Sequence, residues 1–317
     1  MAVLVTGAGG LVGTRIVQKL LDRKETVICL DRDLRMGRLD HFIGEHQVMA
    51  VQADVTDLKA VVSIISGNDI DRVIHTAAIL PPTTENDPLL GTSVNIVGTN
   101  NVFEASRVNG VKRVVYPSSI STYRDQSDYG DAELDEDAVQ RPYSIYGATK
   151  LVNEFTAQAF SKNWGLDCRG LRIPAVLGHG RETGRTAAAS QMISRAAVGE
   201  AFESPVPAEQ CTAYAYVDDV AELMVQVAFS ENLTRNVYCM PAHRASLGDI
   251  ADKVRRLLPK AAISFLPATE GFIQINRLNG ARLIKDLGYQ GLALETCILA
   301  HINEARRERQ LPTLGPT

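Results

Sequence analysis

Short apolar runs alternate with amphipathic stretches through the first half of the chain. The runs have the length and β-branched composition of buried strands, and they predict strands at residues 2–6, 26–31, 47–52, 72–76 and 112–118. Helical spacing of apolar residues predicts helices at about 11–23, 57–67 and 88–109, then a longer helix at about 143–164 and a strand at 167–173. Because strands and helices alternate, we expect an α/β fold with a doubly wound parallel sheet.

The pattern changes after Pro174. Glycine and proline interrupt shorter elements there, and the regular alternation ends. We therefore expect residues 1–175 to form the main domain and residues 176–317 to form a smaller, substrate-binding lobe over the carboxyl edge of the sheet. Segments at about 214–240 are expected to return to the main domain, and the proline-containing tail 311–317 is expected to be frayed.

The first predicted strand ends in a glycine turn. Gly7, Gly10 and Gly13 have the spacing G-x-x-G-x-x-G between a strand and a helix. This arrangement predicts a tight turn whose backbone approaches a pyrophosphate, with the amino end of the helix directed at the phosphates. Asp31 ends the second predicted strand, 18 residues after Gly13, where a ribose-binding carboxylate is expected. A glycine turn alone also occurs without a ligand, but this context favours dinucleotide binding.

The acidic residue at the end of the second strand bears on the choice of dinucleotide. A carboxylate at Asp31 accepts hydrogen bonds from both ribose hydroxyls and repels a 2′-phosphate, which favours NAD over NADP. Arg32 and Arg35 oppose this preference, because a guanidinium can hold that phosphate. We therefore expect NAD, with NADP as the weaker alternative.

Polar and small residues also follow the third and fourth predicted strands. Asp54 can accept from an adenine amino group while the amide of Val55 pairs with the ring, and Thr56 can cap the next helix at the same time. His75 lies within an apolar strand, a position more typical of a core histidine than of a catalytic one. Small residues that let the chain pass close to a cofactor come next: Thr76, Ala77 and Ala78.

A tyrosine and a lysine share one face of the predicted helix 143–164. Tyr146 and Lys150 are four residues apart, and an ammonium beside a phenol favours the phenolate and lowers a pKa that is initially about 10. Such a tyrosine can exchange a proton with a substrate hydroxyl, and Ser119 can hold the same oxygen. Tyr143 is a rival phenol, but it lacks a lysine four residues on. Taken alone, the pair is more often an ordinary surface pair.

In combination these motifs resemble the extended short-chain dehydrogenase/reductases, in their NAD-dependent epimerase/dehydratase branch. The resemblance is strong over residues 1–175 and rests on Thr6–Gly13, Asp31, Asp54-Val55, His75–Ala78, Asn95–Val102, Ser118-Ser119 and Tyr146-x-x-x-Lys150. It implies a Rossmann domain in which Tyr146 is the general acid/base, Lys150 binds the nicotinamide ribose and Ser119 bonds the reacting oxygen. The cofactor-binding residues that it implies are Gly7, Gly10, Leu11, Val12, Gly13, Asp31, Arg32, Asp54, Val55, Thr76, Ala77, Ala78, Asn95, Tyr146, Lys150 and Ile173.

Departures from the family pattern narrow the substrate. Ile120-Ser121-Thr122 stands where related dehydratases carry an Asp-Glu pair, which argues against dehydration. Ala175 and Thr212 replace an asparagine and an arginine that related epimerases use on a nucleotide diphosphate. The resemblance therefore implies hydride transfer to or from a small polar substrate, such as a sugar acid or a hydroxy acid. An epimerase that retains its NAD without net redox change is the first alternative, and a dinucleotide-sensing regulator is the second.

Three basic residues follow the strand at 167–173. His179, Arg181 and Arg185 are candidates for recognising a substrate carboxylate, and a solvated loop is the more common interpretation of such residues.

Composition excludes several classes of partner. The net charge of −4 gives no reason to expect nucleic acid, no apolar run has the ~18–20 residues of a membrane span, and no metal-binding motif occurs. Five widely spaced cysteines suggest reduced core thiols and a cytoplasmic protein. We expect a homodimer that pairs the helices at 88–109 and 143–164, as relatives do.

Overall fold

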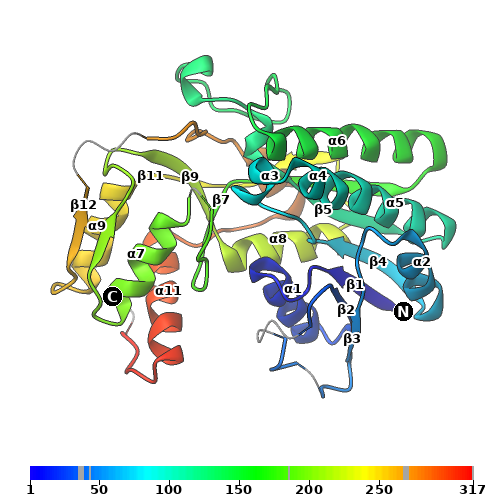
Figure 1. The fold of residues 1–317 in the computed structure, drawn as a ribbon, viewed down its shortest axis with the longest axis horizontal. Coiled ribbons are helices and arrows are strands. Elements are labelled where there is room, and N and C mark those ends of the chain that lie inside the picture. The colour runs from blue at the N-terminus through cyan, green and yellow to red at the C-terminus, as the bar shows by residue number, and fades with distance from the viewer. Residues whose placement is uncertain (35–38, 43, 185, 267–270, 316–317) are drawn as a thin grey trace.

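The computed structural model describes residues 1–34, 39–42, 44–184, 186–266 and 271–315, so Arg35 and Arg185 lie outside the described residues. The main sheet has seven strands in the order β10-β6-β5-β4-β1-β2-β3, and every neighbouring pair is parallel (Figure 1). The strands are β1 (Ala2–Thr6), β2 (Thr26–Asp31), β3 (Val48–Gln52), β4 (Ile70–His75), β5 (Arg113–Ser119), β6 (Asp167–Ile173) and β10 (Val237–Cys239). The strand order reverses between β1 and β4, which confirms the doubly wound sheet and puts the switch point at the glycine turn.

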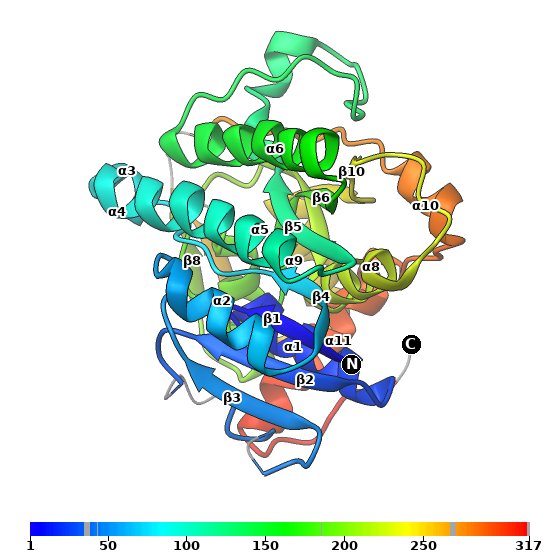
Figure 2. The ribbon, with the colours of Figure 1, turned by 90° about the vertical axis from the view of Figure 1, so that its right-hand side faces the viewer.

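Helices cover both faces of this sheet. One face carries α1 (Leu11–Asp22) and α8 (Val217–Phe229), which pack on each other. The opposite face carries α2 (Leu58–Gly67), α5 (Thr99–Val108) and α6 (Ile145–Trp164), which run side by side in Figure 2. The strands β1 and β2 are largely buried between these layers, which explains their apolar sequences, whereas the edge strand β3 is only partly covered.

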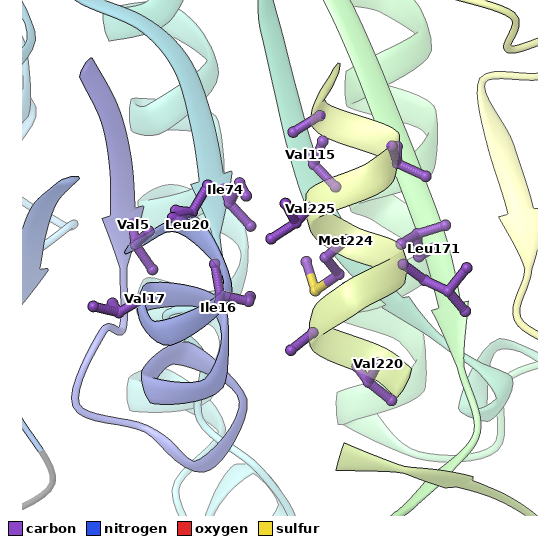
Figure 3. Packing of buried hydrophobic residues seen from close by; sticks show 14 of the residues in the cluster. Val5, Ile16, Val17, Leu20, Ile74, Val115, Leu171, Val220, Met224 and Val225 are labelled. Atoms are coloured by element: carbon purple, nitrogen blue, oxygen red, sulfur yellow. The ribbon is translucent and has the colours of Figure 1, made fainter. Parts of the chain in front are cut away.

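Helical spacing explains how α1 binds the sheet. Ile16 and Leu20 lie one turn apart on one face of α1 and are fully buried. Figure 3 shows them beside the strands, with Met224 and Val225 of α8 alongside. Each such side chain contributes roughly 1.5–3 kcal/mol by leaving water. This packing fixes the amino end of α1 at the switch point.

A second group of elements lies beyond the carboxyl edge of the sheet, at the left of Figure 1. It contains the three-stranded sheet β11-β9-β7 and the two-stranded sheet β12-β8. Its elements are β7 (Ala175–Leu177), α7 (Ala188–Ala197), β8 (Phe202–Ser204), β9 (Cys211–Tyr216), β11 (His243–Ser246), α9 (Leu247–Leu257), β12 (Ile263–Phe265) and α11 (Leu294–Glu308). The chain crosses between the two groups more than once. After β9 it returns to the main sheet, where α8 packs on α1 and β10 pairs with β6, and later α10 (Ala281–Leu287) contacts β10.

Several local predictions need correction. The helix expected at 88–109 is divided into α4 (Pro88–Thr92), the π-helix η1 (Ser93–Gly98) and α5, and a separate short helix, α3 (Thr83–Asn86), precedes it. Asp57, and not Thr56, caps α2, because its carboxylate accepts the amide of Ala60 at 3.1 Å.

The third correction concerns the tail, because residues 311–315 are docked and not frayed. The amide of Leu314 donates to Asn303 of α11 at 2.7 Å, and the Asn303 amide group donates to the Leu314 carbonyl at 3.0 Å.

All five cysteines are free thiols and four of them are buried, as expected for core residues. Among the described residues, no helix combines the length and the apolar character needed to cross a bilayer.

Candidate active site

One cavity of about 650 Å³ runs along the carboxyl ends of the central strands. It begins at the glycine turn, passes the end of β4 and the start of α6, and ends against the loop after β7 and residues 272–274. Most of the residues predicted to bind the cofactor or to act in catalysis line it: Gly7, Gly10, Leu11, Val12, Gly13, Thr76, Ala78, Ser119, Tyr146, Lys150 and Ile173.

The glycine turn is shaped by contacts that leave no space for side chains. Gly7 has φ of +67°, and a Cβ there would lie 2.6 Å from the amide nitrogen of Ala77. A Cβ on Gly13 would lie 2.1 Å from the Gly7 carbonyl oxygen. Gly10 is the N-cap of α1 and offers no side-chain cap, so the first amides of the helix have no side-chain acceptor there. This open helix end fits the pyrophosphate of a dinucleotide.

Asp31 lies directly beside this turn. Its carboxylate accepts the amides of Gly9 at 2.9 Å and Asp33 at 3.2 Å, so it braces the turn as well as standing where a ribose is expected. Arg32 is exposed. Asp54 accepts both the amide and the hydroxyl of Thr56, at 2.9 and 2.8 Å.

Six of the predicted cofactor residues do not line the cavity: Asp31, Arg32, Asp54, Val55, Ala77 and Asn95. Asn95 is buried in the π-helix, where its side chain accepts the amide of Ile79 at 2.8 Å and donates to the Ile79 carbonyl at 2.9 Å. It therefore clamps the backbone that follows β4. Val55 is buried against Gly98, where a Cβ would lie 2.7 Å from its side chain.

Ser119, Tyr146 and Lys150 converge in the middle of the cavity. Ser119 ends β5, and its hydroxyl lies close enough to the Tyr146 phenol to lower the pKa of that tyrosine. The Lys150 ammonium donates to the carbonyl of Pro117 at 3.0 Å and lies 5.5 Å from the centre of the tyrosine ring. The neighbouring Ser118 donates its hydroxyl to Glu154 at 2.5 Å.

Local caps and contacts explain this convergence. Ser144 caps α6 by accepting the amide of Gly147 at 3.0 Å. A Cβ at Gly147 would lie 2.1 Å from the Ser121 carbonyl oxygen, so the helix start packs directly on the turn after β5. The rival Tyr143 donates its hydroxyl to the Ile273 carbonyl at 3.1 Å.

The expected lowering of the tyrosine pKa is wrong for the protein without ligand. Burial raises the pKa of Tyr146 to about 12, because the phenolate leaves water; the Ser119 hydrogen bond and the charge of Arg181 act in the opposite direction. Glu85 adds a smaller upward contribution. Burial also lowers the pKa of Lys150 to about 8. Desolvation therefore dominates, and the contributions that oppose it at Tyr146 come from Ser119 and Arg181 and not from the Lys150 ammonium.

Arg181 brings a second cation to the phenol. Its guanidinium lines the cavity and donates to the carbonyl of Val176 and, at 2.6 Å, to the hydroxyl of Thr186. Burial lowers the pKa of Arg181, and the opposing contributions come from Tyr146 and Tyr214, not from any carboxylate of the described residues. The guanidinium therefore has no anionic partner within the described part of the chain.

His179 does not enter the cavity with Arg181. Its ring bonds to Ser194 at 3.0 Å and to Glu308 at 2.7 Å. The core interpretation of His75 is confirmed, since the ring is 2% exposed and both nitrogens are hydrogen-bonded.

Several polar residues of the cavity were not predicted from the sequence, among them Glu85 and Gln274. Glu85 accepts the amide of Tyr146 at 3.3 Å. Gln274 belongs to the segment 272–274, which is distant in sequence from the other residues of the cavity. No motif marks either of them.

The fold and the cleft together define a dinucleotide-binding α/β protein whose switch-point cleft contains a serine, a tyrosine and a lysine. The sequence model of the NAD dependent epimerase/dehydratase family matches residues 3–238, and the chain belongs to this family. This membership confirms the expectation of NAD as the cofactor and of an NAD-dependent enzyme of the short-chain dehydrogenase/epimerase type.

Individual relatives are more distant. An uncharacterized epimerase/dehydratase of Staphylococcus haemolyticus is 26% identical over 270 residues, which cover 83% of each chain. The L-threonine dehydrogenase of Clostridium difficile superposes with a TM-score of 0.87 at 23% identity, covering 98% of this chain and 99% of the other. The UDP-glucose 4-epimerase of Thermus thermophilus, solved in complex with NAD, gives a TM-score of 0.82 at 24% identity, covering 96% and 99%. At these identities the structures show a shared fold, and both dehydrogenases and epimerases have it.

Proposed function

We propose that this protein is an NAD-dependent dehydrogenase/reductase that transfers hydride between the nicotinamide and the carbinol carbon of a small hydroxy acid or sugar acid. The observation that carries the proposal is the pairing of two groups in one cavity. The phenol of Tyr146 lies near both the Ser119 hydroxyl and the Arg181 guanidinium. That guanidinium lacks an anionic partner among the described residues. A hydroxyl at the phenol and a carboxylate at the guanidinium satisfy both groups.

Each residue of the centre has a proposed role. In the oxidative direction Tyr146 acts in its phenolate form and takes the hydroxyl proton, which leaves it as the neutral phenol, and Ser119 donates a hydrogen bond to the same substrate oxygen. Lys150 holds the nicotinamide ribose and adds positive charge near the phenol. NAD, when bound, supplies the hydride acceptor. Positioning of the two reactants contributes much of the acceleration.

The cofactor contacts follow from the same proposal. The open end of α1, with Leu11 and Val12, holds the pyrophosphate, while Asp31 holds the adenosine ribose. Asp54 and Val55 recognise adenine. The remaining proposed contacts are Arg32, Thr76, Ala77, Ala78, Asn95 and Ile173. We propose residues 1–175 as the cofactor domain and 176–317 as the substrate lobe, apart from the returning segments at about 214–240.

Two positions favour a small substrate over a nucleotide sugar. Ala175 lines the cavity with a methyl group, so it offers no hydrogen bond to a diphosphate. Thr212 is buried and does not line the cavity. A nucleotide diphosphate therefore lacks a cation at the place where related epimerases supply one.

The test is a panel of sugar acids, hydroxy acids and 2-amino-3-hydroxy acids, screened with NAD by NADH absorbance. We expect turnover of at least one carboxylate-bearing alcohol, and a KM that rises at least tenfold in Arg181→Gln. The control is Arg256→Gln on the exposed side of α9, whose KM stays at the wild-type value. Equal turnover of the matching uncharged alcohols, or an unchanged KM in Arg181→Gln, contradicts carboxylate recognition. Epimerisation with retained NAD and no NADH assigns the epimerase function instead.

We further propose that the protein acts as a homodimer through α6. Four exposed apolar residues form a stripe at helical spacing along this helix: Ala148, Val152, Phe155 and Ala159. The Phe155 ring is 63% exposed, which is unusual for an aromatic side chain without a covering partner. Light scattering that gives the mass of a single chain at micromolar concentration contradicts this part of the proposal.

A further inference from the structure

A chain of buried hydrogen bonds crosses the sheet beneath the cofactor cleft. Thr6 at the end of β1 bonds to Nδ1 of His75 at 2.6 Å, and Nε2 of His75 bonds to the Thr99 hydroxyl at 3.0 Å. Thr99 donates onward to the backbone carbonyl of Asn95 at 2.7 Å. These four residues are at most 2% exposed, so water does not compete for their hydrogen bonds.

The donors along this chain can be assigned one by one. Because Thr99 gives its single proton to the Asn95 carbonyl, it accepts from His75, so Nε2 carries the imidazole proton. Burial, together with the nearby Lys150 ammonium, lowers the pKa of His75 to about 3, so the ring is neutral and its Nδ1 accepts from the Thr6 hydroxyl. The Thr6 oxygen in turn accepts the amide of Ala77 at 3.4 Å.

Both ends of this series of hydrogen bonds hold the backbone after β4, which forms one wall of the cleft. Ala77 touches the glycine turn, since a Cβ on Gly7 would lie 2.6 Å from its amide nitrogen. Two residues on, the Asn95 side chain clamps the amide and the carbonyl of Ile79. The stretch 76–80 lines the same cavity as the glycine turn and Tyr146, and contacts on both sides hold it in place.

We infer that His75 is a positioning residue, which joins the glycine turn to the π-helix and so sets the wall that faces the pyrophosphate-to-nicotinamide part of NAD. The imidazole touches neither cofactor nor substrate. Its two nitrogens hold Thr6 and Thr99 at a fixed separation. These two threonines in turn determine the position of the backbone of residues 76–79. The adenosine end of the cofactor is expected to be independent of this bridge, because Asp31 and Asp54 lie at the ends of other strands.

The experiment breaks the bridge at either end without removing the ring. Thr6→Val and Thr99→Val keep side-chain volume and delete one hydroxyl each. NAD and AMP affinities are measured by calorimetry for both variants, for the double variant, and for Thr212→Val, a buried threonine in β9 outside the cleft. Urea unfolding of each variant establishes that it is folded.

We expect each single variant to bind NAD about fivefold or more weakly, as the loss of one buried hydrogen bond implies, with AMP binding within twofold of wild type. The double variant is expected to lose no more than the worse single variant, because the bridge is broken only once. An NAD affinity within twofold of wild type in either single variant overturns the inference. A parallel loss of AMP and NAD affinity also overturns it, since that result indicates general loosening. His75→Asn and His75→Gln, which each retain one end of the bridge, serve as second variants if a valine variant does not fold.

Discussion

Replacing Lys150 by methionine should make the folded protein more stable at neutral pH while it removes activity. The ammonium is 3% exposed, and burial lowers its pKa from 10.5 to about 8. Because a tenfold change in proton affinity corresponds to ~1.4 kcal/mol, holding this charge costs the folded state ~3 kcal/mol at pH 7. Methionine has a similar length and carries no charge, so the variant avoids that cost.

The hydrogen bond from the Lys150 ammonium to the Pro117 carbonyl offsets part of the gain. A hydrogen bond to a charged group contributes about 1.5–3 kcal/mol, so the net stabilisation at pH 7 is on the order of 1 kcal/mol. The dependence on pH is the sharper measurement. Below pH 8 the lysine is protonated in both states and the cost is complete, whereas between pH 8 and 10.5 only the unfolded state is protonated and the cost declines.

The assay is urea unfolding of the nucleotide-free wild type and Lys150→Met at pH 7 and pH 9.5. The wild type should gain about 2 kcal/mol relative to the variant over this interval, since both chains share every other titrating group. Lys162→Met, which replaces an exposed lysine near the carboxyl end of the same helix, is the matched control for a lysine-to-methionine change. A difference for Lys150→Met that is the same at both pH values refutes the argument from burial.

Three further outcomes follow from the site. Tyr146→Phe should lower kcat by about 10²–10⁴-fold without changing NAD affinity, and because burial raises the pKa of Tyr146 to about 12, the wild-type oxidation rate should climb from pH 6 to 9 while the variant stays flat. Asp31→Ser should weaken NAD binding about tenfold and improve NADP binding; calorimetry that finds NADP still excluded assigns the selectivity elsewhere. Glu154→Gln should destabilise the protein by about 3–5 kcal/mol, because Arg172 is buried with its charge paired to Glu154 at 2.7 Å, and a loss below 1 kcal/mol in urea unfolding is inconsistent with that pairing.

The strands were the most predictable part of the fold. The strands β1, β2 and β5 are largely buried on both faces, so each has an apolar run as its core. The helix expected at 88–109 was predicted as one element because its apolar spacing is continuous. The π-helical turn at Ser93–Gly98 is associated with a tertiary contact, the hydrogen bond between the Asn95 side chain and the amide of Ile79. A contact between residues this far apart is not predicted by local sequence spacing.

The candidate site divides in the same way. The glycine turn and the Tyr146–Lys150 pair have local spacing rules, so their position in the cleft followed from sequence. Glu85 enters the cavity through a short helix, and Gln274 enters from a segment that crosses over from the second lobe. Their positions depend on packing between distant parts of the chain, which spacing does not encode.

The pKa of Tyr146 depends on burial as well as on its charged neighbours, and burial is not visible in the spacing of residues. An ammonium beside a phenol lowers the pKa of the phenol only when burial does not cost the phenolate more than the ammonium returns. In the structure the same burial acts on three groups, since it raises the pKa of Tyr146 and lowers the pKa values of Lys150 and Arg181. Burial thereby makes the charged form of each group less favourable than it is in water, and a ligand group of opposite or complementary charge lowers that cost. A cavity of this kind binds most strongly a pair of ligands that satisfies all three groups together, which is why the cofactor and an anionic alcohol are expected to strengthen each other's binding.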